Sequence, residues 1–209
     1  KTEMWYVLAC NPGAVLFAGL AEGVTENSLR RALADGTAAD SLVRLAIEPG
    51  QALYIPGGLV HAIGAGCLIY EVQQNSNTTY RLYDWDRKDS AGKPRALHIE
   101  ESFQTIDWTL PPPAMLAPLP RPACGGNRWY DVVACPYFTV RKVEVAAPLA
   151  VPVTGETFHA LFVAQGAAAV NAGGETLVLQ TGASCLIPAA ASAYQLTPAP
   201  SAELLVTTL

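Results

Sequence analysis

Short apolar runs recur along this chain, and Gly, Pro and Asn separate them. The runs are rich in branched and aromatic residues and have the length of single β-strands. Six of them fall in the first half: Met4–Ala9, Val15–Ala18, Leu42–Ile47, Ala52–Ile55, Cys67–Gln73 and Thr79–Trp85. Strands at such regular spacing predict a mostly β chain folded as a sandwich or barrel.

A single helical pattern interrupts the strands, from Glu26 to Ala34. Leu29, Ala32 and Leu33 recur there at helical spacing, and Gly36 supplies a stop signal. The sequence therefore predicts one short helical insertion within the β-rich first part.

A proline-rich stretch divides the chain at residues 107–127 and ends on two glycines. Such a stretch has few backbone donors and is not expected to continue a sheet, so it predicts an extended linker. We expect one domain in residues 1–106 and a second in residues 128–209.

The second part repeats a spacing of the first. Gly182 and Pro188 are as far apart as Gly50 and Pro56, but Ala193 stands where the first copy has His61. This repeat predicts two related barrels, the second of which is degenerate and lacks a metal-binding histidine at that position.

Composition narrows the class of partner. Of the 209 residues, 51% are hydrophobic and 15% charged, with a net charge of −5 and no cluster of Lys or Arg. These values describe a compact globular protein and argue against nucleic-acid or membrane partners. No uninterrupted apolar run reaches membrane-spanning length, and the first residues do not have the pattern of a signal peptide.

The cysteines indicate a reducing compartment. They are five in number, scattered, and contain no CxxC pair, which predicts reduced thiols and a cytoplasmic location. We expect Cys10, Cys67 and Cys185 to act as small core hydrophobes, since they lie in apolar runs.

The stretch from Gly50 to His61 carries the first sign of chemistry. Its spacing of Gly50, Pro56, Gly58 and His61 fits the second sequence motif of the cupin barrels. The resemblance implies that the glycines and proline turn the chain and that His61 points into the barrel mouth as a metal ligand.

The run EVQQNSNTTYRLYDWDR, from Glu71 to Arg87, is more specific. It resembles the signature of type I mannose-6-phosphate isomerases (phosphomannose isomerases) in their short bacterial form. The resemblance implies two cupin (jelly-roll β-barrel) domains and one Zn²⁺ per intact protein. It also implies interconversion of mannose 6-phosphate and fructose 6-phosphate through an enediol(ate), and a protein that is a monomer or weak homodimer.

Further residues enter by the same resemblance. The segment KTEMWYVL is similar to the family segment whose glutamate binds zinc, which makes Glu3 the second metal ligand, beside His61. The family's remaining ligands come from an upstream Gln-x-His pair. We therefore expect a first barrel that is incomplete at its N-terminus, and weak zinc binding by these residues alone. Lys1 is implied as a substrate contact.

Arg81 takes the position of the family's catalytic arginine, with pairing to Asp84 or Asp86 as the structural alternative. Glu71 and Gln73 share one face of a strand; we expect Glu71 to act as an acid, a base or a sugar-orienting group, and Gln73 as its hydrogen-bonding neighbour. Asn77 replaces an aspartate common in the family and is expected to hold Arg81 by a weaker, neutral hydrogen bond.

Other interpretations remain open. A catalytically inactive cupin that binds sugar phosphate is the first alternative. A metal-dependent oxygenase ranks last, since no His-x-His pair occurs. The other two histidines are expected to be structural: His98 satisfying a backbone carbonyl, and His159 within the second barrel.

Overall fold

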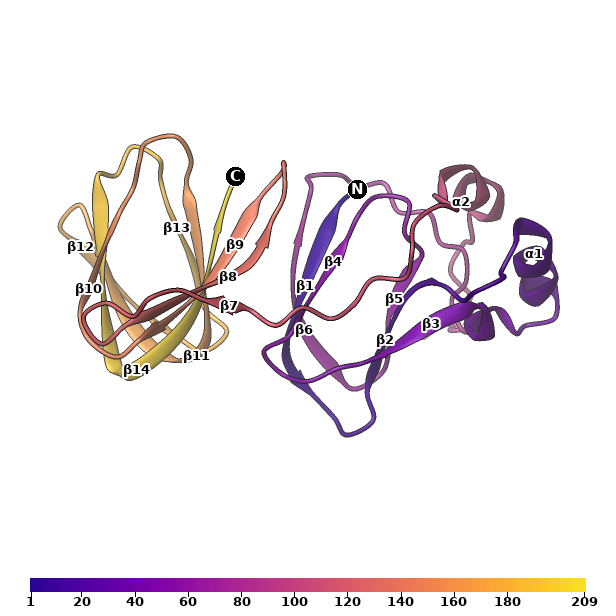
Figure 1. The fold of residues 1–209 in the computed structure, drawn as a ribbon, viewed down its shortest axis with the longest axis horizontal. Helices are drawn as coiled ribbons and strands as arrows, with labels where there is room; N and C mark the ends of the chain where they lie inside the picture. The colour runs from indigo at the N-terminus through magenta and orange to yellow at the C-terminus, as the bar shows by residue number, and fades with distance from the viewer. The chain divides into compact units, whose positions relative to one another are not determined.

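The computed structural model describes residues 1–209 and divides them into two compact units, Lys1–Met115 and Leu116–Leu209. The division falls inside the proline-rich stretch. Both units are built mainly of antiparallel strands (Figure 1). Neither of the two α-helices is long and apolar enough to cross a membrane.

Two three-stranded sheets form the first unit, in the orders β4-β1-β6 and β3-β2-β5. Their strands are β1 (Glu3–Cys10), β2 (Val15–Leu20), β3 (Leu42–Ala46), β4 (Ala52–Ile55), β5 (His61–Ile63) and β6 (Cys67–Gln73). Trp5 and Val7 from β1 share one core cluster with Leu16 and Ala18 from β2, so the two sheets face each other across a common interior. The predicted mostly β fold is confirmed.

The predicted helix is present with its expected bounds, α1 (Glu26–Ala34). Thr25 caps its N-terminus, where the Thr25 hydroxyl accepts the Ser28 N–H and the Ser28 hydroxyl accepts the Thr25 N–H. Leu29 is fully buried, and Gly36 follows the helix at φ +72°, a conformation that favours glycine.

A short 3₁₀ helix, η1 (Ala38–Ser41), and a second α-helix, α2 (Ile99–Thr105), complete the first unit. The two α-helices lie together at one end of this unit (Figure 1). Arg30 of α1 joins them, because its guanidinium donates to both carboxylate oxygens of Glu100, at 2.7 and 3.0 Å. The same guanidinium lies 3.9 Å from the ring centre of Phe103.

The predicted strand Thr79–Trp85 is wrong: these residues form no regular element. Thr79, Tyr80, Tyr83 and Trp85 are residue types that favour strands, but Trp85 and Asp86 both have φ +51°, which a strand cannot accommodate. The backbone of Arg81 pairs instead with His98, ahead of α2.

The second unit contains one eight-stranded antiparallel sheet with the main order β12-β11-β14-β9-β8-β7. The other two of the eight strands lie off this order: β10 pairs with β14, and β13 pairs with β11. The strands are β7 (Leu119–Pro120), β8 (Arg128–Ala134), β9 (Thr139–Val145), β10 (Leu149–Pro152), β11 (His159–Ala172), β12 (Glu175–Gln180), β13 (Ser184–Ile187) and β14 (Ala193–Thr208). Its core is a cluster of valines and leucines that includes Val143, Val163, Leu196 and Leu204.

The repeated spacing corresponds to repeated local structure. Gly50 (φ +89°) leads into β4, which ends immediately before Pro56, and Gly182 (φ +85°) leads into β13, which ends immediately before Pro188. In both copies a left-handed glycine turns the chain into a short strand that the proline then ends.

One detail of the proline-rich stretch differs from expectation. Leu119 and Pro120 form the strand β7 and pair with Asp131 and Tyr130 of β8. Proline cannot donate a ladder hydrogen bond but is tolerated at the edge of a sheet, which is where β7 lies. The expectation that this stretch would not join a sheet is therefore wrong at these two residues.

Three cysteines behave as predicted from their apolar surroundings. Cys10 and Cys67 pack against the core of the first unit, and Cys185 packs against that of the second. Their thiols fill space among aliphatic side chains, as small hydrophobes do.

Candidate active site

A pocket of about 790 Å³ opens in the first unit and collects most of the predicted site residues. Its walls come from β1, β5 and β6, from residues 78–87 and from α2. Lys1, Glu3, His61, Glu71 and Arg81 all line it. Residues that are far apart in sequence are thus brought together, although no single strand carries the site.

Glu3 is placed by the register of the first sheet. It lies opposite Ile55 of β4 and Gln73 of β6, and it is only 4% exposed. The alternative of an exposed terminal carboxylate is therefore excluded. A carboxylate buried this far requires cations or hydrogen-bond donors around it, and the Lys1 Nζ lies 3.5 Å from Glu3 Oε1.

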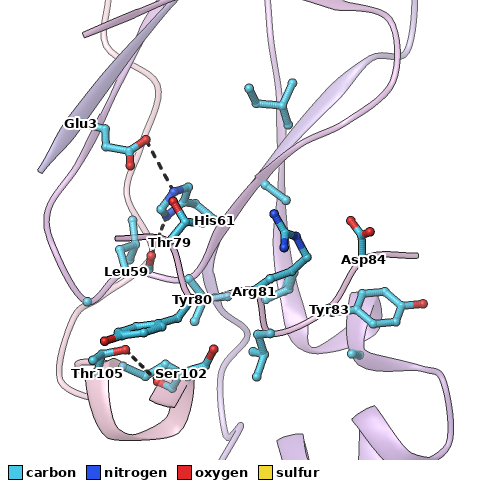
Figure 2. Close-up of a pocket in the computed structure, with 18 of the residues that line it drawn as sticks. Glu3, Leu59, His61, Thr79, Tyr80, Arg81, Tyr83, Asp84, Ser102 and Thr105 are labelled. Atoms are coloured by element: carbon cyan, nitrogen blue, oxygen red, sulfur yellow. Dashed lines mark hydrogen bonds and ion pairs between the residues drawn. The ribbon is translucent and has the colours of Figure 1, made fainter. Parts of the chain in front are cut away.

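His61 begins β5 and faces Glu3 (Figure 2). Its Nδ1 lies 2.7 Å from the Leu59 carbonyl oxygen, and its Nε2 lies 3.7 Å from Glu3 Oε2. A carbonyl oxygen can only accept, so Nδ1 carries the hydrogen, and in the neutral ring the Nε2 lone pair is turned toward Glu3. The edge-to-face contact with Trp5, at 5.2 Å between ring centres, further fixes the ring.

This pair has the chemistry of part of a zinc site. A carboxylate oxygen and an imidazole nitrogen, both ligands that Zn²⁺ accepts, converge on one point, and a backbone carbonyl orients the imidazole from behind. No cluster of three or more His, Cys, Asp or Glu side chains suited to a metal occurs in residues 1–209. The residues present therefore fit one side of a zinc site.

Glu71 and Gln73 lie on the same face of β6, where they are opposite Trp5 and Glu3 of β1. Partial burial and then the neighbouring charge of Glu3 raise the pKa of the Glu71 carboxyl above its ordinary value, although Lys1 opposes the shift. The Lys1 ammonium donates a hydrogen bond to Gln73 Oε1. Lys1, Glu3 and Glu71 thus form one polar cluster in the pocket wall, and Gln73 joins it through Lys1 without itself lining the pocket.

Arg81 reaches the pocket from the irregular segment that follows β6, and its side chain lies between those of His61 and Asp84 in Figure 2. Its Nη1 donates to the Ala96 carbonyl oxygen at 3.2 Å. The alternative of an ion pair with Asp84 or Asp86 is wrong, because Asp84 pairs with Arg87 and Arg95 instead. Asn77 forms no hydrogen bond with Arg81, so the expected contact between them is also wrong.

Sequence reasoning missed the group of charges beside Arg81. Asp84 is 6% exposed and accepts two hydrogen bonds from Arg95, which hold the pKa of its carboxyl below the ordinary value. Arg87 Nη2 lies 3.2 Å from the same carboxylate. Arg87 and Arg95 therefore hold the Asp84 carboxylate next to Arg81 in the wall of the pocket. The contact joins two irregular segments, so no periodicity in the sequence could have revealed it.

The remaining two histidines do not line this pocket. The His98 Nδ1 accepts the backbone N–H of Arg81 at 3.3 Å, so the expectation that the ring would satisfy a carbonyl is wrong. His159, in the second unit, lies 3.2 Å from the Tyr194 hydroxyl, and burial lowers the pKa of its imidazole.

Fold and site together define a class of protein: a cupin-type β chain with a histidine and a buried carboxylate facing each other in one pocket. Residues 130–208 match the family model of the mannose-6-phosphate isomerase cupin domain. The chain is 34% identical over 195 residues to the mannose-6-phosphate isomerase of Streptococcus mutans. This match covers 93% of the chain and 60% of that relative. The chain thus spans less than two thirds of that relative's length.

Solved structures agree. The mannose 6-phosphate isomerase of Bacillus subtilis matches with a TM-score of 0.87 and 27% identity over 100% of this chain and 64% of its own. That of Salmonella typhimurium, bound to its substrate and a zinc atom, matches with a TM-score of 0.67 and 14% identity over 100% of this chain and 66% of its own, which shows a shared fold. The predicted resemblance is confirmed: the chain is similar to mannose-6-phosphate isomerases over nearly all of its length.

Proposed function

We propose that the protein containing this chain is a zinc-dependent isomerase that interconverts mannose 6-phosphate and fructose 6-phosphate. The observation that carries the proposal is the convergence of Glu3, His61, Glu71 and Arg81 on one pocket, in a chain related to mannose-6-phosphate isomerases. The fold alone would be insufficient support, because one architecture can host many reactions.

We assign the catalytic barrel to residues 1–106 and a second barrel, without a metal site, to residues 128–209, with residues 107–127 as the linker. The local structure supports this assignment. His61 is the first residue of β5, whereas Ala193, at the corresponding place in the repeat, is the first residue of β14. A methyl group cannot coordinate a metal, so the second barrel is proposed to be structural.

Glu3 and His61 are proposed to hold the zinc ion through Oε2 and Nε2. When bound, zinc would polarise the sugar carbonyl and the adjacent hydroxyl, which acidifies the C2 proton. Zinc in catalytic sites usually has three protein ligands and one open position, so the proposed site needs at least one further ligand besides these two. The hydrogen bond from His61 Nδ1 to Leu59 keeps Nε2 directed at the site.

Proton transfer is assigned to Glu71. Isomerisation requires a base to remove the proton from C2 of the aldose and return it to C1, while a hydroxyl proton passes from O2 to O1. Glu71 is given this role because it lines the pocket beside Glu3, and partial burial raises the pKa of its carboxyl, which makes it a stronger base than a free glutamate. Lys1, which lines the pocket, would orient the sugar hydroxyls, and Gln73 would hold Lys1 in place through the hydrogen bond between them.

Arg81 is proposed to stabilise the negative charge that develops on the enediolate oxygens. Its guanidinium is available because no carboxylate pairs with it, Asp84 being bound by Arg87 and Arg95. The excess of positive charge around Asp84 would also favour the anionic phosphate at this end of the pocket.

The test is production of fructose 6-phosphate from mannose 6-phosphate by the full-length protein with zinc added. His61→Ala should abolish turnover and reduce bound zinc, measured by mass spectrometry. His159→Ala is the matched control: the same change in the second unit should leave both quantities near wild type. Turnover in His61→Ala equal to that of the control would contradict the metal role.

Two outcomes of the same assay separate the proposal from its alternative. Turnover in the wild type supports the isomerase. Saturable binding of mannose 6-phosphate without turnover would support a sugar-phosphate-binding cupin. This is the second candidate function because the chain offers only two candidate zinc ligands. If neither binding nor turnover is observed, both candidate functions are rejected.

A further inference from the structure

The backbone around Arg81 has no support from regular secondary structure. β6 ends at Gln73 and α2 begins at Ile99, and no helix or named strand lies between them. A catalytic arginine must be held to within a fraction of an ångström to act on a transition state, so another part of the fold has to fix this segment.

His98 provides this support through a reciprocal pair of hydrogen bonds. The Arg81 N–H donates to His98 Nδ1 at 3.3 Å, and the His98 N–H donates to the Arg81 carbonyl oxygen at 2.8 Å. One residue therefore satisfies both backbone groups of Arg81. Because the ring accepts at Nδ1, its hydrogen must lie on Nε2.

The residues around His98 are themselves anchored. His98 precedes α2, and its carbonyl oxygen accepts from both the backbone N–H and the hydroxyl of Ser102, at 2.9 and 2.7 Å. The helix is in turn fastened to α1 by the ion pair and ring contact of Arg30 with Glu100 and Phe103. A continuous set of contacts thus runs from α1 through α2 to the backbone of Arg81.

The His98 side chain does not line the pocket, so it does not act by touching substrate. We propose that His98 is a positioning residue for Arg81: its Nδ1 fixes the backbone from which the Arg81 guanidinium reaches the reacting oxygens. This inference rests on the proposed function, because it takes Arg81 as the group that stabilises the enediolate.

The test compares three variants of the full-length protein in the isomerase assay. His98→Ala should lower kcat by about 10- to 100-fold, the usual effect of a small misplacement of a catalytic group, with KM changed by less than about threefold. His98→Asn should recover most of kcat, because its amide oxygen can occupy the place of Nδ1. His98→Gln carries its amide one carbon further, toward the place of Nε2, and should remain impaired.

A double variant separates positioning from general stability. If His98 acts through Arg81, then Arg81→Ala with His98→Ala should be no slower than Arg81→Ala alone. A merely structural role would slow both backgrounds by the same factor. The proposal would be overturned if His98→Ala had the same kcat as wild type, or if His98→Ala slowed the wild-type and Arg81→Ala proteins equally.

Hydrogen exchange at the Arg81 amide supplies a readout that needs no turnover. Exchange should be faster in His98→Ala than in wild type and close to wild type in His98→Asn. Should His98→Ala fail to fold, the contrast between the Asn and Gln variants tests the same bond. A wild type without isomerase activity would reject the proposed function, whereas unchanged exchange at Arg81 would reject the positioning role whatever the activity.

Discussion

Substituting Gly58 by alanine should destabilise the fold and weaken zinc binding, although Gly58 has no side chain that could act in the reaction. Gly58 has φ +89° in the turn that leads into β5. A Cβ at this position would lie 2.9 Å from the Asp107 Cβ and 3.1 Å from the Asp107 backbone nitrogen. The two chain segments are joined there by a hydrogen bond of 3.0 Å from the Asp107 N–H to the Gly58 carbonyl oxygen.

Two costs follow from this geometry. A left-handed conformation costs a non-glycine residue about 1–2 kcal/mol. An added carbon well inside the ordinary contact distance costs about 1–3 kcal/mol more in displaced neighbours. Gly58→Ala should therefore lower the free energy of unfolding by about 2–5 kcal/mol. The turn also carries Leu59, whose carbonyl orients His61, so zinc affinity and kcat should fall as well.

Gly23→Ala is the matched control. Gly23 has φ +78° and no atom within 4 Å of the position that a methyl group would take, so it incurs only the conformational cost. Urea denaturation of both variants in the full-length protein, followed by circular dichroism, measures the difference. If Gly58→Ala is no less stable than Gly23→Ala, the close approach of Asp107 is not a rigid constraint and the reasoning fails.

Three further predictions concern other parts of the molecule. Leu29→Ala should lower unfolding free energy by about 2–5 kcal/mol by urea denaturation, because the side chain is fully buried; a loss below about 1 kcal/mol would contradict this. Burial opposes ionisation of Glu144, but Lys142 and a tyrosine hydroxyl outweigh it and lower its pKa. The stability that ionised Glu144 contributes is thus present above the ordinary glutamate pKa and is lost as the pH falls through its lowered pKa in the folded protein. The stability difference between wild type and Lys142→Met should then shrink between about pH 6 and about pH 3, and a constant difference would refute the linkage. Asn77→Asp should leave kcat within about twofold of wild type, because Asn77 does not contact Arg81; a large increase would show a coupling the structure lacks.

Elements with local signals could be predicted from the sequence. The helix Glu26–Ala34 has its expected bounds because its cap, its buried face and its stop signal all lie within a dozen residues. The shared face of Glu71 and Gln73 follows from strand alternation and needs no knowledge of the partner strand. Local geometry of this kind is encoded locally, so a single sequence suffices to find it.

The segment Thr79–Trp85 shows where this approach fails. Its composition favours a strand, but the segment pairs with no strand, and distant residues determine its path. Asp84 is held by Arg95, and the backbone of Arg81 is held by His98. Neither contact has a spacing that periodicity could detect, since both join irregular segments. The loop is therefore the part of the pocket whose structure depends most on tertiary contacts.

The meeting of Glu3 and His61 depends on the closure of the fold and not on strand pairing. β1 pairs with β4 and β6, whereas β5 pairs with β2, so the two side chains belong to different sheets. They approach each other only because those sheets share one interior. Motif spacing could identify His61, but Glu3 could be proposed only from family resemblance, because its burial arises when the sheets pack. This convergence of a buried carboxylate and an imidazole is the observation that supports the proposed zinc ion.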